Sequence, residues 1–364
     1  MNQKLYVAEV FEKLHGMPEK GYKEFKTSEF ISKELKKMGY DVIDKIGGTG
    51  IVATLDSGKP GPYFGLRADM DALPYEIDGK EVCAHTCGHD ANSSMVLATA
   101  KKIIEKGISK GKFFLIFQPA EEVLGGAESI IESGHIEEIE ELVGIHLRPI
   151  EETRLGQATP ALVHGASYRM IAKIKGLNSH GARPHLGVNA VDAAVLAVNA
   201  INAIHLDPRV PYSIKVTKLK VGETVNIIPD RAELSIDMRA QTNEVMDEMI
   251  SKAKKAIINT AQAIGAEGTI EFVGGVPAAE YNDEMIELTR KAIEEVLGES
   301  KDPLITTGGE DFHFYTKVLG IKTAYIGLGA DLTPGLHHLD MKFDKKTLEL
   351  GVGILENLVT KRFN

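Results

Sequence analysis

Apolar residues in the first half of the chain follow helix-like and strand-like spacings in alternation. Over 24–38, Ile31 and Leu35 fall on one helical face, and Gly39 follows as a helix stop. The remaining apolar segments predict strands at 51–55, 63–66, 112–117 and 142–145 and a helix over 95–104. This alternation constrains the chain to an α/β layer with helices on both faces of a sheet.

From about residue 165 the spacing changes to that of an antiparallel sheet. Residues 231–239 alternate apolar and polar side chains, as expected for a strand with one buried face. Helices are predicted over 188–204 and 243–264, with strands before, between and after them. The order strand, helix, strand, strand, helix, strand is the ferredoxin-like split βαβ arrangement.

Glycine and proline near residues 165 and 277 indicate the limits of this second pattern. We therefore expect an inserted α+β ferredoxin-like domain over 165–277. The catalytic domain would be discontinuous, over 1–164 and 278–364, and would contain a mixed sheet. A length of 364 residues agrees with two domains, because single hydrophobic cores rarely grow so large. The predicted fold class is α/β.

The charge balance argues against two classes of partner. With 42 Lys and Arg against 52 Asp and Glu, the formal net charge is −10. Binding to nucleic acid or to an anionic membrane relies on clustered Lys and Arg, and we find no such cluster. We expect neither partner. The start of the chain lacks the pattern of a signal peptide, and no apolar run is long enough to span a membrane, which predicts a cytoplasmic protein.

Cys87 and His89 are the first candidates for metal ligands. A thiolate and an imidazole two residues apart can both reach one cation. They precede the predicted helix, where the helix dipole favours a thiolate. Cys83 is the only other cysteine, and a disulfide between it and Cys87 is the alternative use of the thiol.

Two further ligand-type segments follow apolar strands. Glu121 and Glu122 come just after 113–117, and His146 comes just after 142–145. Open α/β sheets bind ligands at the carboxyl ends of their strands, so these side chains are expected at one edge. One carboxylate can bind a cation while its neighbour accepts a proton from water. The residue pattern does not show which of the two glutamates binds the cation and which accepts the proton.

His337 and His338 form the last candidate segment, in a turn near the end of the chain. Two exposed loop histidines are the alternative interpretation. Together with the earlier segments they complete a set of imidazole, thiolate and carboxylate groups typical of zinc and related metals. The sequence therefore predicts a metal-dependent amide hydrolase.

Five motifs resemble, in order and spacing, those of the two-metal amidohydrolases of the aminoacylase and carboxypeptidase superfamily. They are RADMDALP at 67–74, CGHD at 87–90, QPAEE at 118–122, NIIPD at 226–230 and GEDF at 309–312. The branch that this chain resembles most contains hippurate hydrolases, auxin-conjugate hydrolases and N-acetyldiaminopimelate deacetylases. The resemblance covers nearly the whole chain and implies hydrolysis of the amide bond of N-acyl amino acids, with acetyl or aroyl groups.

The resemblance also implies two divalent metal ions per subunit, for which zinc, manganese, cobalt and nickel all suit the ligands. It implies that Cys87 bridges them, and that the other ligands are His89, Glu122, His146 and His337. Glu121 matches the catalytic glutamate of the family, acting as base and then as acid. Asp71 would lie behind the ligands and orient an imidazole.

For the inserted domain the resemblance implies a lid that also forms a homodimer or a higher homo-oligomer. His180 matches a histidine that reaches the active site of the neighbouring subunit and polarises the scissile carbonyl. Asn226 and Arg239 match residues that hold the carboxylate of the substrate. On its strand pattern alone, Arg239 is equally well interpreted as a solvated side chain.

Three positions depart from the family pattern, namely Asn92, the pair at 178–179 and Leu339. These departures leave the predicted metal ligands in place but keep His338 open as an alternative to His337. Two other functions also stay open. One is a dipeptidase or carboxypeptidase with the same metals, and the other is a non-catalytic protein that binds metal or peptide.

Overall fold

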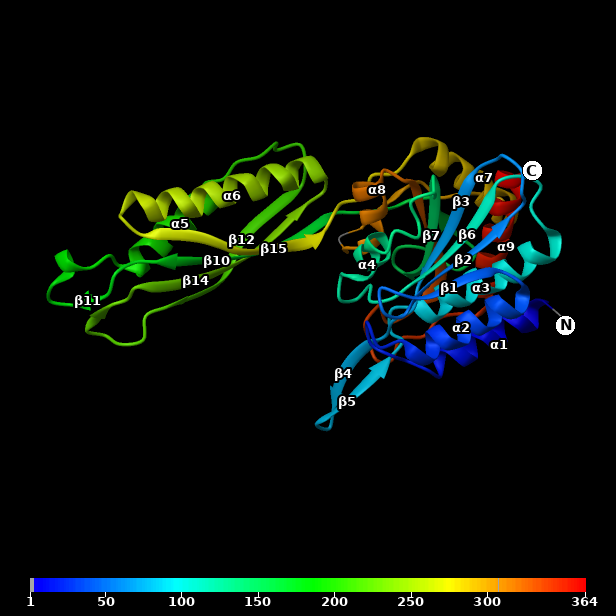
Figure 1. Ribbon diagram of the computed structural model, residues 1–364, viewed down its shortest axis with the longest axis horizontal. Coiled ribbons are helices and arrows are strands. Elements are labelled where there is room, and N and C mark those ends of the chain that lie inside the picture. Colours follow the sequence, from blue (N-terminus) through cyan, green and yellow to red (C-terminus); the bar gives the residue numbers. More distant parts are fainter. Residues whose placement is uncertain (1–2, 307) are drawn as a thin grey trace. The chain divides into compact units, whose positions relative to one another are not determined.

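The computed structural model describes residues 3–306 and 308–364, and these residues form two compact units (Figure 1). The first unit contains residues 3–163, 280–306 and 310–364, and the second contains 164–279 and 308–309. The predicted insertion at 165–277 therefore lies inside the main stretch of the second unit.

The first unit is built on a seven-stranded mixed sheet with the order β1-β2-β6-β3-β7-β17-β8. The strands are β1 Asp41–Ile46, β2 Gly50–Asp56, β3 Tyr63–Asp69, β6 Lys112–Gln118, β7 Glu141–Pro149, β8 Ala158–Thr159 and β17 Lys322–Leu332. The four neighbours β6, β3, β7 and β17 are parallel, and the outer strands are antiparallel. The carboxyl ends of four strands therefore meet at one edge, as predicted.

Helices cover both faces of this sheet. The larger group consists of α1 Gln3–His15, α2 Phe25–Met38, α3 His89–Lys106, α7 Asp283–Leu297 and α9 Lys346–Phe363. The opposite face carries α4 Gly126–Glu132, the short turn η2 Asp311–His313 and α8 Phe314–Leu319, which contact one another. Two smaller pairs flank the sheet, namely the hairpin of β4 Leu73–Ile77 with β5 Lys80–Ala84, and β9 Leu162–His164 with β16 Leu304–Thr306.

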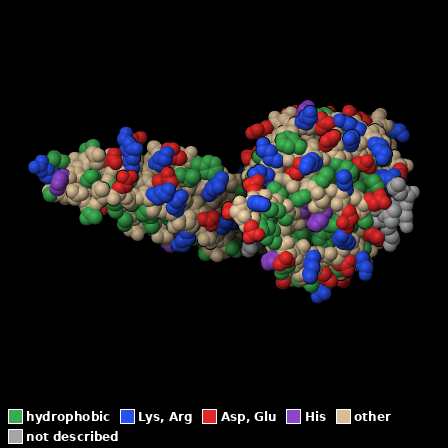
Figure 2. Space-filling model, turned by 90° about the horizontal axis from the view of Figure 1, so that it is seen from below, with side chains coloured by type: hydrophobic (Ala, Val, Ile, Leu, Met, Phe, Trp, Pro, Cys, Tyr) green, Lys and Arg blue, Asp and Glu red, His purple; other side chains and the backbone are tan. Residues whose placement is uncertain are grey.

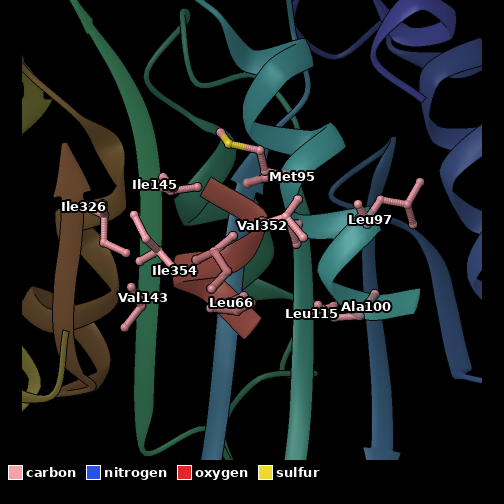
Figure 3. Packing of buried hydrophobic residues seen from close by; sticks show 14 of the residues in the cluster. Leu66, Met95, Leu97, Ala100, Leu115, Val143, Ile145, Ile326, Val352 and Ile354 are labelled. Carbon is pink, nitrogen blue, oxygen red and sulfur yellow. The ribbon is translucent and has the colours of Figure 1, made fainter. Parts of the chain in front are cut away.

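The main core lies between the sheet and the larger group of helices (Figure 3). Strand residues Leu66, Leu115 and Val143 belong to one buried cluster with Leu97 of α3 and Val352 of α9, and all five are at most 4% exposed. Burial of such side chains is worth roughly 2 kcal/mol each, which fixes the strands whose ends carry the candidate ligands.

The second unit confirms the predicted ferredoxin-like arrangement. Its elements are β10 Ala166–Lys175, α5 Ala190–Asn202, β12 Tyr212–Val221, β14 Arg231–Ala240, α6 Asn243–Ala263 and β15 Glu267–Val276. The sheet has the order β12-β14-β10-β15 and is antiparallel throughout. Both helices pack side by side on it around an apolar cluster (Figure 1). Asn189 and Thr242 cap the two helices by accepting backbone N–H groups, which explains where each helix begins.

At one end of this unit the short strands β11 Ser179–His180 and β13 Ile227–Ile228 pair beside the turn η1 Pro184–Leu186. Acidic and basic side chains are interspersed on the face shown in Figure 2. Among the described residues, no helix combines the length and the apolar composition needed to cross a bilayer.

Candidate metal centre

The predicted ligands of the first unit gather at the carboxyl edge of its parallel strands. The four parallel strands carry candidate side chains at or just beyond their carboxyl ends, and two more candidates lie at the start of α3. In strand order these side chains are Glu121 and Glu122 after β6, Asp71 after β3, His146 on β7 and His337 after β17, with Cys87 and His89 at α3.

Two local expectations were wrong. We expected a helix over 95–104, but α3 begins at His89, because Gly88 adopts φ 93° and turns the chain directly into the helix. We also expected His146 to follow its strand, whereas β7 continues to Pro149. Pairing with β17 extends the strand, so that His146 points to the site while the fully buried Leu147 continues the core.

One group of donors consists of Cys87, His89 and His146. The Cys87 Sγ lies 3.5 Å from His146 Nε2, and one donor atom of each residue lies within 4.8 Å of the other two. All three side chains are buried. Thiolate and imidazole at this spacing are a typical zinc ligand set.

A second group consists of Cys87, Glu122 and His337. The His337 Nε2 lies 3.5 Å from Glu122 Oε1, and the three donor atoms again lie within 4.8 Å of one another. Cys87 therefore belongs to both groups. Among the described residues His338 belongs to neither group, and its Nδ1 accepts the backbone N–H of Asp340 at 3.1 Å. Of the two terminal histidines, His337 is the one that faces the cluster.

The tautomers of the buried histidines suit a cation. His89 Nδ1 lies 3.0 Å from the carbonyl oxygen of Asp71, and His146 Nδ1 lies 2.7 Å from that of Leu147. A carbonyl only accepts, so each Nδ1 donates, and in the neutral ring the lone pair is then on Nε2. Within the described residues, His89 Nε2 and Glu122 Oε1 are buried without a hydrogen-bond partner. Leaving such acceptors unsatisfied costs about 1–3 kcal/mol each, and a divalent cation would satisfy both.

Asp71 holds the ligand segments together. Its carboxylate accepts the backbone N–H of Glu121 at 3.1 Å and of Glu122 at 3.0 Å, and lies 3.3 Å from His89 Nδ1. We predicted that Asp71 would lie behind the ligands and orient an imidazole. The additional contact with both glutamate amides was not predictable from the sequence.

Burial lowers the pKa of His89, but the nearby Asp69 and Cys87 outweigh burial and raise this pKa well above its usual value. Burial dominates the protonation of Glu121, Cys87 and His146. It raises the pKa of Glu121 well above its usual value, and the nearby Glu310 and Glu122 raise it further. Burial also raises the pKa of Cys87, so the expected help from the helix dipole does not prevail in the metal-free protein. A cation would reverse this by stabilising the thiolate directly. Burial lowers the pKa of His146 to about 4, which keeps this imidazole neutral and able to bind metal.

A buried ion network lies beside the cluster. The Arg67 guanidinium is 0% exposed and contacts Asp69 at 2.6 Å, Glu310 at 3.0 Å and Asp311 at 3.1 Å. Asp69 in turn lies 3.9 Å from His89 Nε2. Our sequence analysis assigned no role to these residues. The signal was present, since a charged pair within the apolar run 63–69 requires buried partners.

The remaining predicted residues lie in the second unit. His180 is exposed on β11, and Asn226 is exposed just before β13. Arg239 lies on β14, where its guanidinium pairs with Asp237 at 3.2 Å. In the first unit, Asn92 donates to Asp69 at 2.9 Å. Both cysteines are free thiols, so the alternative disulfide is absent.

Residues 65–361 match the model of peptidase family M20/M25/M40. The chain is 30% identical over 365 residues to the hippurate hydrolase of Campylobacter jejuni, covering 96% of this chain and 94% of that one. It is 31% identical over 331 residues to the N-acetyl-L-cysteine deacetylase of Bacillus subtilis, covering 87% and 79%.

A solved structure shares the fold. It is a Bacillus subtilis protein described as a dinuclear metal-binding peptidase of family M20. The TM-score is 0.82 at 22% identity, with 99% of this chain and 98% of that chain covered. The shared architecture extends over the first unit and the second unit.

Proposed function

Because the chain belongs to peptidase family M20/M25/M40, a family of metal-dependent hydrolases, we propose that it cleaves the amide bond of N-acyl amino acids. The observation that carries this proposal is the pair of donor groups that share Cys87, with Glu121 beside them. The names of the two relatives support an N-acyl amino acid as substrate, with either an aroyl or an acetyl group.

In this proposal Cys87, His89 and His146 hold one divalent cation, and Cys87, Glu122 and His337 hold the other. Bound cations supply a Lewis acid for the carbonyl and lower the pKa of water. Glu121 accepts a proton from the attacking water and later donates it to the leaving amine. Its burial supports the first step, since a raised pKa makes the carboxylate a stronger base.

We test this function with protein stripped of metal by a chelator and then reloaded separately with zinc, manganese, cobalt or nickel. Each preparation is assayed with N-benzoylglycine, N-acetyl amino acids and dipeptides. We expect activity only after reloading, and higher kcat/KM for an N-acyl amino acid than for any dipeptide. Undiminished turnover by the stripped protein would refute metal-dependent hydrolysis, and a preference for dipeptides would identify a dipeptidase.

We further propose that the inserted unit is a lid and forms a dimer in which His180 serves the active site of the neighbouring subunit. Its exposed position on β11 supports a role toward a partner or a substrate. Asn226 and Arg239 are proposed to bind the carboxylate of the substrate, a task that suits the fixed donors of a guanidinium group.

Replacing His180 by Ala is expected to lower kcat by about 10²-fold, because a donor to the developing oxyanion is lost. Mixing this variant with Glu121→Gln should restore part of the activity, since mixed dimers regain one complete site. The measurement is kcat before and after the two variants exchange subunits, and His185→Ala, another exposed histidine nearby, is the control. Failure of mixing to restore turnover would place His180 in the site of its own subunit.

A further inference from the structure

The backbone of His337 adopts an unusual conformation for a candidate ligand. Its φ is 64°, in the left-handed region that non-glycine residues seldom occupy. Its side chain is 54% exposed, and its Nε2 lies 3.5 Å from Glu122 Oε1. Packing around the imidazole therefore contributes little to its orientation, which must come from the backbone.

Two residues form hydrogen bonds with the backbone of His337, one with its N–H group and the other with its carbonyl oxygen. The His337 N–H donates to the carbonyl oxygen of Thr86 at 2.7 Å, and the Tyr75 hydroxyl donates to the carbonyl oxygen of His337 at 3.0 Å. Tyr75 lies on β4 and Thr86 just after β5, so both belong to the hairpin arm and its exit. The hairpin of β4 and β5 and the segment after it thus contact His337, which lies more than 250 positions away along the chain.

The two hydroxyl groups are also bonded to each other, with Tyr75 Oη 2.6 Å from Thr86 Oγ1. Tyr75 has a single proton, which goes to His337, so the Thr86 hydroxyl donates to Tyr75. Thr86 is 3% exposed and directly precedes Cys87. The chain of contacts therefore connects the backbone of one candidate ligand to the segment that carries another.

We propose that Tyr75 and Thr86 are positioning residues that hold His337 at the distance needed to share a cation with Cys87 and Glu122. This inference rests on the proposed two-metal site and goes beyond it. The Tyr75 hydroxyl contacts the backbone of His337, which belongs to the second donor group alone, whereas His89 and His146 of the first group are oriented by Asp71 and Leu147. Loss of the Tyr75 hydroxyl should therefore weaken one of the two cations and leave the other unchanged.

The test is Tyr75→Phe, studied by calorimetric titration of metal-free protein with Co²⁺. Wild-type protein is expected to bind two cations in separable events. In the variant the affinity of one event should fall by about ten-fold, the lower range for residues that support metal ligands, while the other is unchanged. The thermal melting temperature of the metal-free variant should match the wild type, which a general structural defect would not allow.

Three further variants make the test specific. Thr86→Val, which removes the hydroxyl that donates to Tyr75, should weaken the same event. Tyr6→Phe removes a hydroxyl bonded to Glu34 on α2 and should change neither event. In a His337→Ala background, Tyr75→Phe should have no further effect on cobalt affinity.

The possible failures are distinguishable. Two unchanged binding events in Tyr75→Phe, or an equal weakening of both, would overturn the positioning role and leave the proposed function intact. A wild-type protein that binds fewer than two cations would refute the two-metal site and this inference with it.

Discussion

Replacing Glu121 by Gln is expected to lower kcat by about 10³-fold while the protein still binds two cations. The amide has nearly the shape of the carboxylate, and the backbone N–H that bonds Asp71 is untouched. Glutamine cannot accept a proton from water, however, so the proposed base is lost. The measurement is kcat together with the metal content of the purified variant.

A matched control for this variant is Glu132→Gln at the end of α4, which removes a carboxylate of the same type outside the cluster. We expect its kcat to equal that of the wild type. Near-normal turnover of Glu121→Gln would exclude Glu121 from proton transfer. Loss of a cation together with the activity would instead identify Glu121 as a metal ligand. The structure allows this alternative, because the Glu121 carboxylate lies 3.9 Å from His89 Nε2.

Replacing Arg67 by Met is expected to lower the free energy of unfolding of the catalytic unit by about 3–5 kcal/mol. The guanidinium is fully buried against three carboxyl groups, and removing it leaves the charges of Asp69 and Glu310 without this partner. Burial raises the pKa of Asp311 to about 8, so this third group is largely neutral at pH 7. Methionine fills much of the volume, so the effect reports the lost charge more than a cavity. Urea denaturation followed by circular dichroism measures the change.

Arg154→Met is the control for the buried network, since Arg154 also pairs with a carboxylate, Asp331 at 2.7 Å, but is largely exposed. Exposed pairs are screened by water, and we expect its effect to be small beside that of Arg67→Met. An Arg67→Met protein as stable as the wild type would show that the three acids do not depend on the guanidinium.

Several features of the fold followed from local patterns. Helix 24–38 was predicted because its apolar spacing has the helical period and Gly39, at φ 101°, ends it as expected. The start of α3 was missed because residues 92–94 are polar and resemble a loop. In the structure they are buried, since Asn92 donates to Asp69 and Ser93 donates to the Asp69 carbonyl at 2.6 Å. Tertiary hydrogen bonds thus allowed polar residues into the first turns of a helix whose start the pattern placed too late.

The amino-acid sequence by itself determined the alternation of elements, the inserted second unit and the kinds of side chain placed at strand ends, because periodicity and chain breaks are local properties. Tertiary structure decided which of His337 and His338 faces Glu122, which acids share Arg67, and that Tyr75 contacts His337. These pairs join residues up to about 260 positions apart. These residues meet because β3, β7 and β17 pack side by side in one sheet. No local pattern along the chain encodes that packing.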